Sequence, residues 1–131
     1  MIGLDTNVLV RYLTQDDAAQ ARKADAVIND AVARRERCVI GPVVLCELVW
    51  VLREAYDTPK DQLLTTLERI LATQQFEIVE KDRMREAFEA FRTGRADFAD
   101  YVIGTTHRAA GCDETVTFDR RLRGTPGFRL L

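Results

Sequence analysis

Two aspartates stand directly after short segments that predict β-strands. Asp5 follows residues 1–4, and Asp119 follows residues 115–118. In open parallel sheets, ligands bind at the edge formed by the carboxyl ends of the strands, so both carboxylates are candidates for a functional site. Each also has a purely structural interpretation. Asp5 can cap the helix expected after it, and Asp119 can serve a turn before the arginine pair that follows it.

Glu47 is the one charged residue in an otherwise apolar stretch, residues 43–52. This stretch predicts a largely buried helix. A lone buried carboxylate costs on the order of several kcal/mol unless it is paired, protonated or bound to a metal. The structural alternatives are that Glu47 faces outward, or that it pairs with a buried arginine such as Arg11 or Arg53.

Asp97 and Asp100 are three residues apart at the start of another expected helix, so their side chains share one face. Asp97 can be the N-cap of that helix, and Asp100 can be its capping-box partner at the third position. This explanation covers Asp100 less well, because Tyr101, Val102 and Ile103 follow at once and indicate a buried helix.

Taken together, these carboxylates predict a cation site, because the sequence does not indicate a basic residue that would neutralise them. Sites built from oxygen ligands alone favour Mg²⁺ or Mn²⁺ over zinc. Such a site suits metal-assisted hydrolysis of phosphodiester bonds, in which the ions activate water and stabilise the attacking and leaving oxygens. That chemistry needs no serine, cysteine or histidine nucleophile.

The composition excludes several other classes of protein. The chain has 131 residues, no serine, and His107 as its only histidine, which rules out a Ser-His-Asp triad and a multi-histidine zinc site. It has neither a P-loop nor a GxGxxG motif, and its three cysteines are not spaced as zinc ligands. No apolar run approaches the roughly 20 residues of a membrane span, and no leader is evident. We therefore expect a cytoplasmic protein without a membrane anchor.

The charge balance argues against nucleic-acid binding by bulk positive charge, because 19 basic and 21 acidic residues give a net charge of −2. However, 16 of the 19 basic residues are arginine. The arginine guanidinium binds carboxylates and phosphates bidentately, so the excess of arginine is compatible with a phosphate ligand.

Apolar periodicity predicts that strands alternate with helices along the chain. Strands are expected at residues 1–4, 38–40, 76–79, 115–118 and 128–131. This alternation implies an α/β fold with a mostly parallel central β-sheet flanked by helices on both faces. No repeat, linker or low-complexity segment interrupts the pattern, so residues 1–131 are expected to form a single domain.

The segment from Met1 to Leu13 closely resembles the opening of PIN-domain ribonucleases, specifically the VapC toxins of bacterial type II toxin–antitoxin systems. Three further segments resemble the family in order and spacing. They are Glu47 in its apolar helix, the run from Ala96 to Ile103, and the run from Thr115 to Asp119. The resemblance covers essentially the whole chain and implies a PIN-like single domain.

In that family an acidic quartet binds one or two Mg²⁺ or Mn²⁺ ions. The resemblance assigns metal binding and catalysis to Asp5, Glu47, Asp100 and Asp119. Asp100 is preferred over Asp97 because it stands directly before the apolar helical turn. Auxiliary roles fall to neighbouring polar groups, which are Thr6, Asn7, Asp97 and Thr117. Several arginines near the motifs can either contact RNA phosphates or be plain solvated charges. They are Arg11, Arg95, Arg120, Arg121 and Arg123.

The function implied by the resemblance is that of a Mg²⁺/Mn²⁺-dependent endoribonuclease, the toxin component of a toxin–antitoxin pair. Metal-activated water would hydrolyse phosphodiester bonds in RNA and leave a 5′-phosphate and a 3′-hydroxyl. The resemblance further implies a homodimer and a cognate VapB-like antitoxin whose C-terminal segment occupies the active-site groove.

Three alternatives compete with this interpretation. A non-catalytic PIN-fold domain that binds RNA or protein would be signalled by the loss of an acid, and none of the four is missing. A housekeeping RNA-processing nuclease would share the site, and an antitoxin gene directly upstream would favour the toxin instead. Haloacid-dehalogenase phosphatases also place an aspartate after a strand, but they need a second aspartate at the position of Asn7.

Overall fold

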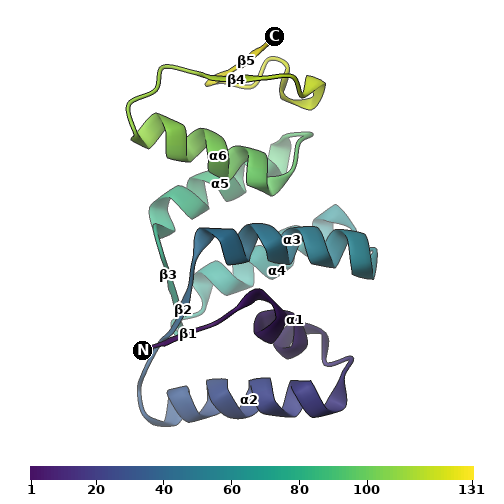
Figure 1. Cartoon of the computed structure of the whole chain (residues 1–131), viewed down its shortest axis with the longest axis vertical. Coiled ribbons are helices and arrows are strands. Elements are labelled where there is room, and N and C mark those ends of the chain that lie inside the picture. Colours follow the sequence, from purple (N-terminus) through teal and green to yellow (C-terminus); the bar gives the residue numbers. More distant parts are fainter. The chain divides into compact units, whose positions relative to one another are not determined.

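The computed structural model describes all 131 residues, which divide into two compact units (Figure 1). Unit 1 comprises residues Met1–Val79, and unit 2 comprises residues Glu80–Leu131. Each unit contains its own parallel sheet and its own buried apolar side chains. No helix of the structure combines the length and the apolar character that crossing a membrane requires.

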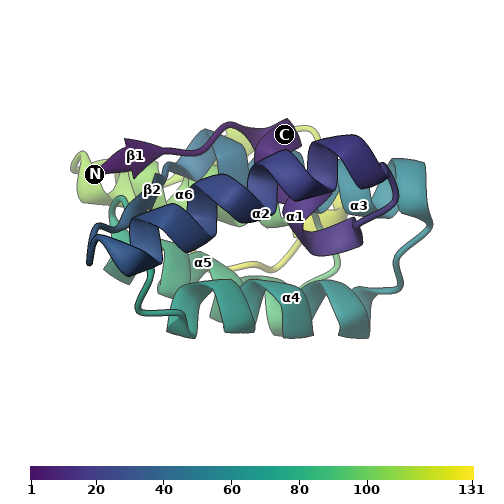
Figure 2. The ribbon, with the colours of Figure 1, turned by 90° about the horizontal axis from the view of Figure 1, so that it is seen from below.

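Unit 1 is built on a three-stranded parallel sheet with the order β1-β2-β3. Its elements in chain order are β1 (Ile2–Gly3), α1 (Thr6–Thr14), α2 (Ala18–Ala33), β2 (Cys38–Ile40), α3 (Pro42–Tyr56), α4 (Lys60–Ala72) and β3 (Phe76–Ile78). Helices flank this sheet in Figure 1, and Figure 2 shows α2 running alongside α1.

Local signals in the sequence begin the helices of unit 1. Asp5 is the N-cap of α1, and Asp17 is the N-cap of α2, where its Oδ1 accepts a hydrogen bond from the backbone N–H of Gln20 at 3.0 Å. Pro42 occupies the first turn of α3, a position at which its missing N–H costs nothing. Burial of the apolar faces then holds the helices in place, with Leu9 of α1 and Leu45 of α3 completely enclosed.

Unit 2 pairs two helices with a two-stranded parallel sheet. Its elements are α5 (Lys81–Thr93), α6 (Phe98–Ala109), β4 (Thr115–Thr117), a short 3₁₀ helix (Arg120–Leu122) and β5 (Phe128–Leu130). Helices α5 and α6 pack against each other, and Phe91 meets Phe98 edge to face with ring centroids 5.9 Å apart. Aromatic pairs of this kind stabilise a core beyond the area they bury.

The loop between α5 and α6 depends on a glycine. The backbone N–H of Ala96 donates to the Tyr101 hydroxyl at 3.2 Å in a buried hydrogen bond. A Cβ on Gly94 would overlap that hydroxyl and lie 2.8 Å from the carbonyl oxygen of Ala90. Gly94 therefore lets Tyr101 reach the loop directly before Asp97.

The predicted fold class is confirmed, since every strand pair is parallel and helices flank the sheet. The strands lie within two residues of the predicted ones, but they form two sheets, of three and two strands, and not one. That residues 1–131 form one domain stays a prediction.

Candidate active site

Asp5 and Glu47 lie in unit 1 and line the same hollow, which has a volume of about 450 Å³. The parallel pairing of β1 with β2 brings the carboxyl ends of both strands to one edge, where α1 and α3 begin and pack on each other. The other polar side chains that line the hollow are Thr6, Asn7, Arg11 and Tyr56. The structure thus brings together two of the four predicted metal ligands and both of their predicted neighbours.

The carboxylates of this hollow carry no basic partner. Oδ1 of Asp5 accepts the backbone N–H of Thr6 at 2.7 Å, so Asp5 does cap α1, as its structural interpretation predicted. The basic side chains of unit 1 that form ion pairs do so with other acids, and none with Asp5 or Glu47. The buried Thr6 hydroxyl has no hydrogen-bond partner. A buried polar atom without a partner is uncommon, and here it lies in the wall of a hollow lined by two free carboxylates.

The expectation that Glu47 is buried is wrong. Helix α3 turns Val43, Glu47 and Trp50 to solvent, with Val43 69% and Trp50 59% exposed. Its buried face is made instead by Leu45, Leu48, Val49 and Leu52. Glu47 faces outward, which was one of its two structural alternatives, because an apolar sequence covers both faces of this helix while the core takes only one.

Arg11 lines the hollow of Asp5 and Glu47, and three hydrogen bonds hold its guanidinium in place. Its guanidinium donates to Asp16 Oδ1 at 3.0 Å, to Gln20 Oε1 at 2.7 Å and to the Tyr56 hydroxyl at 3.1 Å. Hydrogen bonds from the hydroxyls of Tyr56 and Thr14, followed by the charge of Arg11, lower the pKa of Asp16 to about 2. The sequence analysis missed Tyr56 and Asp16, because 40 residues separate them and nothing local signals their contact.

In unit 2, three aspartates gather around the guanidinium of Arg121. Asp119 accepts from it at 2.6 Å and 3.0 Å, Asp97 Oδ1 lies 3.3 Å away, and Asp100 Oδ2 lies 3.6 Å away. The expectation that no basic group neutralises the predicted acids is therefore wrong for unit 2. The signal for this arrangement was available, since Arg121 stands two residues after Asp119.

The structural interpretations of these aspartates hold as well. Asp97 and Asp100 form a reciprocal capping box at the start of α6, with Asp100 Oδ2 accepting the Asp97 N–H at 2.9 Å. Asp119 caps the short 3₁₀ helix through the backbone N–H of Arg121, at 2.9 Å. Thr117 Oγ1 accepts the backbone N–H of Asp119 at 3.0 Å, so Thr117 orients Asp119, one of the predicted site residues.

The electrostatics differ among these acids. Burial raises the pKa of Asp100, although the backbone hydrogen bond from Asp97 acts in the opposite direction. Hydrogen bonds from the side chain and backbone of Arg121 lower the pKa of Asp119, and the same side-chain hydrogen bond raises the pKa of Arg121. Asp119 is thus held as a carboxylate by a cation that the chain itself supplies.

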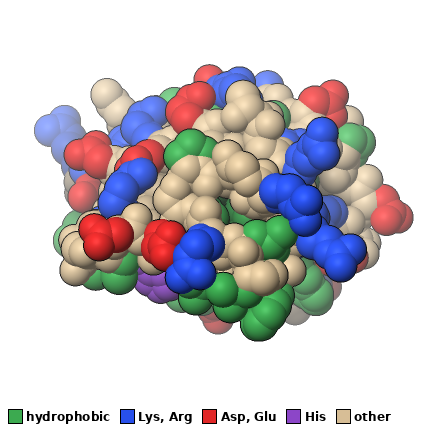
Figure 3. Space-filling view, turned by 90° about the horizontal axis from the view of Figure 1, so that it is seen from above, with side chains coloured by type: hydrophobic (Ala, Val, Ile, Leu, Met, Phe, Trp, Pro, Cys, Tyr) green, Lys and Arg blue, Asp and Glu red, His purple; other side chains and the backbone are tan.

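Unit 2 contains a hollow of its own, with a volume of about 740 Å³ and a basic lining. Four arginines line it, and no acidic residue does; the arginines are Arg95, Arg120, Arg121 and Arg123. Except for Arg121 they form no ion pair in the structure. Figure 3 shows one group of Lys and Arg side chains on the right of the face, while those on the left stand among acidic side chains. Unpaired guanidinium groups around one hollow favour an anionic ligand such as a phosphate.

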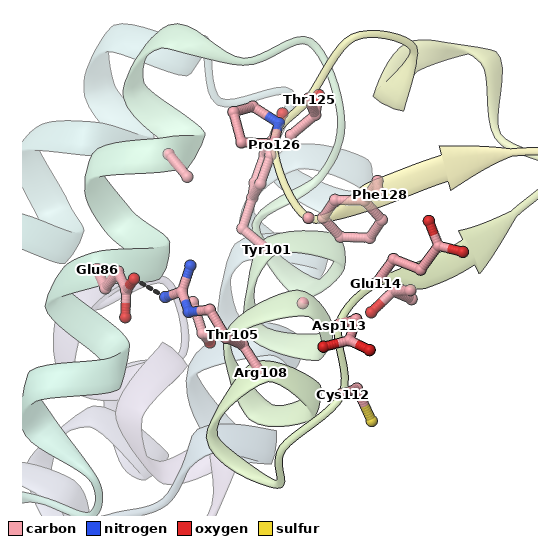
Figure 4. A pocket seen from close by; sticks show the side chains of 14 residues that line it. Glu86, Tyr101, Thr105, Arg108, Cys112, Asp113, Glu114, Thr125, Pro126 and Phe128 are labelled. Atoms are coloured by element: carbon pink, nitrogen blue, oxygen red, sulfur yellow. Dashed lines mark ion pairs between the residues drawn. The ribbon is translucent and has the colours of Figure 1, made fainter.

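A third hollow, of about 200 Å³, takes no part in this arrangement (Figure 4). It lies beside Tyr101 and Phe128, and its one arginine, Arg108, is already paired with Glu86. None of the predicted site residues lines it.

The donor groups suit a hard divalent cation. Within each unit, no three acidic, histidine or cysteine side chains are grouped so as to hold a metal ion. Unit 1 nevertheless offers two carboxylates, the Asn7 amide and the free Thr6 hydroxyl around one hollow, and Mg²⁺ prefers oxygen ligands of these kinds. In unit 2 the aspartates already hold a cation, the guanidinium of Arg121.

Comparison with known proteins identifies the family. The model of the PIN domain family matches residues 2–127, and the chain therefore belongs to that family. A curated relative, the VapC ribonuclease of Aquifex aeolicus (strain VF5), is 24% identical over 120 residues, which cover 92% of this chain and 88% of the relative. No solved structure matches the chain significantly. The resemblance drawn from the sequence motifs is confirmed.

Proposed function

We propose that this protein is a Mg²⁺- or Mn²⁺-dependent endoribonuclease of the VapC type, the toxin of a toxin–antitoxin pair. The observation that carries the proposal is the hollow of unit 1, in which Asp5 and Glu47 lie together without a basic partner. Membership of the PIN domain family and similarity to a protein named VapC ribonuclease support it.

The proposed ligands of one or two metal ions are Asp5 and Glu47 of unit 1 together with Asp100 and Asp119 of unit 2. A bound divalent cation would lower the pKa of a water molecule and stabilise the charge that develops on the phosphate during hydrolysis. Around it, the cap hydrogen bond from Thr6 holds the carboxylate of Asp5, and the capping box holds that of Asp100. Groups fixed before the reaction need no reorganisation during it.

The arginines would bind the RNA backbone. Arg95, Arg120 and Arg121 line the basic hollow of unit 2, and Arg11 lines the hollow of Asp5 and Glu47. Guanidinium contacts to phosphate oxygens position a strand without reading its sequence. We propose these four residues as phosphate contacts, with Thr6, Asn7, Asp97 and Thr117 in supporting roles.

The proposed partners follow from the relationship to VapC ribonuclease. They are an RNA substrate, a cognate VapB-like antitoxin that covers the active site, and a second copy of this chain in a homodimer. Cytoplasmic location stays a prediction.

The deciding experiment compares RNA cleavage by the wild type and by Asp5→Asn, each with Mg²⁺, with Mn²⁺ and with EDTA. We expect cleavage only by the wild type and only with metal. Asp17→Asn is the matched control, because Asp17 caps α2 as Asp5 caps α1 and asparagine caps a helix as well as aspartate does. Cleavage by Asp5→Asn, or in EDTA, would exclude the proposed site.

Two further outcomes separate the alternatives. RNA binding without cleavage at any metal concentration would identify a non-catalytic PIN domain. The toxin role is tested by expressing the chain in bacteria, where growth arrest relieved by coexpression of the adjacent gene is expected. Cleavage without growth arrest would favour a housekeeping RNA-processing nuclease.

A further inference from the structure

Arg121 occupies an unusual position, because one guanidinium contacts three acids of the proposed active site. It donates to Asp119 through both Nε and Nη2 and to Asp97 through Nη1, and Nη2 also lies 3.6 Å from Asp100. These contacts direct the donors of the side chain at carboxylate oxygens, which are the atoms that a divalent cation would need.

The same side chain also lines the basic hollow. Arg95, Arg120 and Arg123 surround that hollow and have no carboxylate partner, so Arg121 is the one arginine of the four that is held on acids. Arg121 and Asp119 are both partly accessible, with side chains 48% and 25% exposed. Both side chains therefore reach solvent, which screens the ion pair and lets water replace its hydrogen bonds when the guanidinium leaves.

We propose that Arg121 is an internal counter-ion that exchanges with the divalent cation, and that on leaving the aspartates it becomes available to bind a phosphate in the hollow. This inference rests on the proposed function. Arg121 fills about four lone-pair sites of Asp119, because Oδ1 accepts its backbone N–H and Nε while Oδ2 accepts Nε and Nη2. A metal ion that binds Asp119 must therefore displace the guanidinium, so metal binding favours the released state. A phosphate in the hollow attracts the guanidinium and favours the same state.

The exchange predicts that metal and RNA bind cooperatively. Two ligands that favour the same state of one side chain each raise the affinity of the other, and they do so by the same factor. Cooperativity of this kind would keep the unit 2 aspartates neutralised until a substrate strand is present.

The test measures the Mn²⁺ affinity of the full chain by calorimetry, with and without a single-stranded 2′-O-methyl RNA whose integrity is checked by gel electrophoresis after each titration. In the wild type, the oligonucleotide should tighten Mn²⁺ binding at least about fivefold, the lower end of common coupling factors. In Arg121→Gln, Mn²⁺ should bind more tightly than in the wild type without RNA, and the oligonucleotide should change that affinity by a smaller factor than in the wild type.

Arg123→Gln is the matched control, because it removes the same charge from the same hollow while Arg123 contacts no aspartate. It should weaken RNA binding, leave the Mn²⁺ affinity unchanged without RNA, and keep the cooperativity. Arg121→Lys adds a second test in case the glutamine variant does not fold. An ammonium lacks the planar fork that reaches several carboxylates, so this variant should also bind Mn²⁺ more tightly than the wild type.

The outcomes distinguish this inference from the function on which it rests. An unchanged Mn²⁺ affinity in Arg121→Gln and Arg121→Lys, or no cooperativity in the wild type, would overturn the exchange and leave the proposed nuclease intact. A wild-type chain that binds neither Mn²⁺ nor Mg²⁺ would overturn the metal-dependent function itself.

Discussion

The two units present the proposed catalytic acids in opposite electrostatic states. In unit 1, Asp5 and Glu47 share a hollow and have no basic partner. In unit 2, Asp100 and Asp119 share Arg121 with Asp97. The two acids of unit 1 therefore have no cation beside them, whereas the acids of unit 2 already contact one, the Arg121 guanidinium.

Helix capping does not conflict with the roles that we propose for these aspartates. Asp5, Asp97 and Asp119 are all N-caps, in both units. A cap uses one lone-pair site of the carboxylate for a backbone N–H, and a carboxylate has about four such sites, so the cap alone does not occupy it. The structural interpretation of each aspartate therefore holds without excluding the functional one.

The largest expected effect is a loss of RNA cleavage on changing an acid of unit 1, where no basic side chain pairs with the proposed ligands. Glu47→Gln should lower RNA cleavage by roughly 100-fold, because removing groups that only support metal ligands already costs 10- to 100-fold. Its melting temperature should stay at the wild-type value, since Glu47 forms no ion pair that could be lost. Glu54→Gln, on the same helix and paired with Arg53, is the control and should cleave normally. Wild-type cleavage by Glu47→Gln would remove it from the site.

A smaller effect, on stability, is expected from a packing change in unit 2. Gly94→Ala places a Cβ against Tyr101 and should destabilise the protein by about 1–3 kcal/mol, as overpacking typically does. Gly3→Ala makes the same change in unit 1, where no atom lies within 4 Å of the new Cβ, and it should be nearly neutral. Urea denaturation measures both, and equal stability of the two variants would contradict the packing argument.

The capping box gives a third comparison. Asp97→Ala removes the N-cap of α6 and should lower the free energy of unfolding by about 1 kcal/mol, whereas Asp97→Asn keeps the cap and should lie close to the wild type. Because Asp97 is proposed as a supporting residue, both variants should cleave RNA better than Glu47→Gln does. Cleavage as poor as that of Glu47→Gln in Asp97→Asn would make Asp97 a metal ligand.

The smallest effect is a pH dependence in unit 1, where Arg11 pairs with Asp16 and forms no ion pair with Asp5 or Glu47. The pKa of Asp16 falls from 3.8 to about 2 on folding, so its stabilising contribution is present above pH 3.8 and is lost as the pH falls through 2. Tyr56→Phe removes the largest cause and should raise that pKa towards 3.8. The melting temperature should drop by at most about a few degrees at neutral pH.

Titration of the Asp16 carboxyl by NMR measures this pKa directly, and an unchanged value in Tyr56→Phe would refute the assignment. The difference in stability between the variant and the wild type should shrink below pH 3, because protonated Asp16 no longer benefits from the hydroxyl.

Much of the fold could be predicted because its signals are local. Asp17, Pro42 and Gly94 mark helix ends through their own hydrogen-bonding or backbone properties, and the apolar spacing of α5 assigns Met84 and Phe88 to the core. The division of the strands into two sheets could not be predicted, because strand pairing depends on contacts between residues far apart in the chain.

The candidate site was predicted less completely. Glu47 was selected because a buried carboxylate is costly and because the family resemblance assigns it to the metal site. The side chain is in fact exposed, so the first reason fails, and the structure supports the choice through its place in the hollow with Asp5. The pairing of Arg121 with Asp97 was missed because 24 residues separate them.

The family of this protein, the alternation of its strands and helices, and the identity of its candidate acids can be read from the chain, because motif order, periodicity and residue type are properties of the chain. Which of those acids have a basic partner follows from the folded structure alone. Charge pairing depends on distances of a few ångströms between side chains, and folding sets those distances.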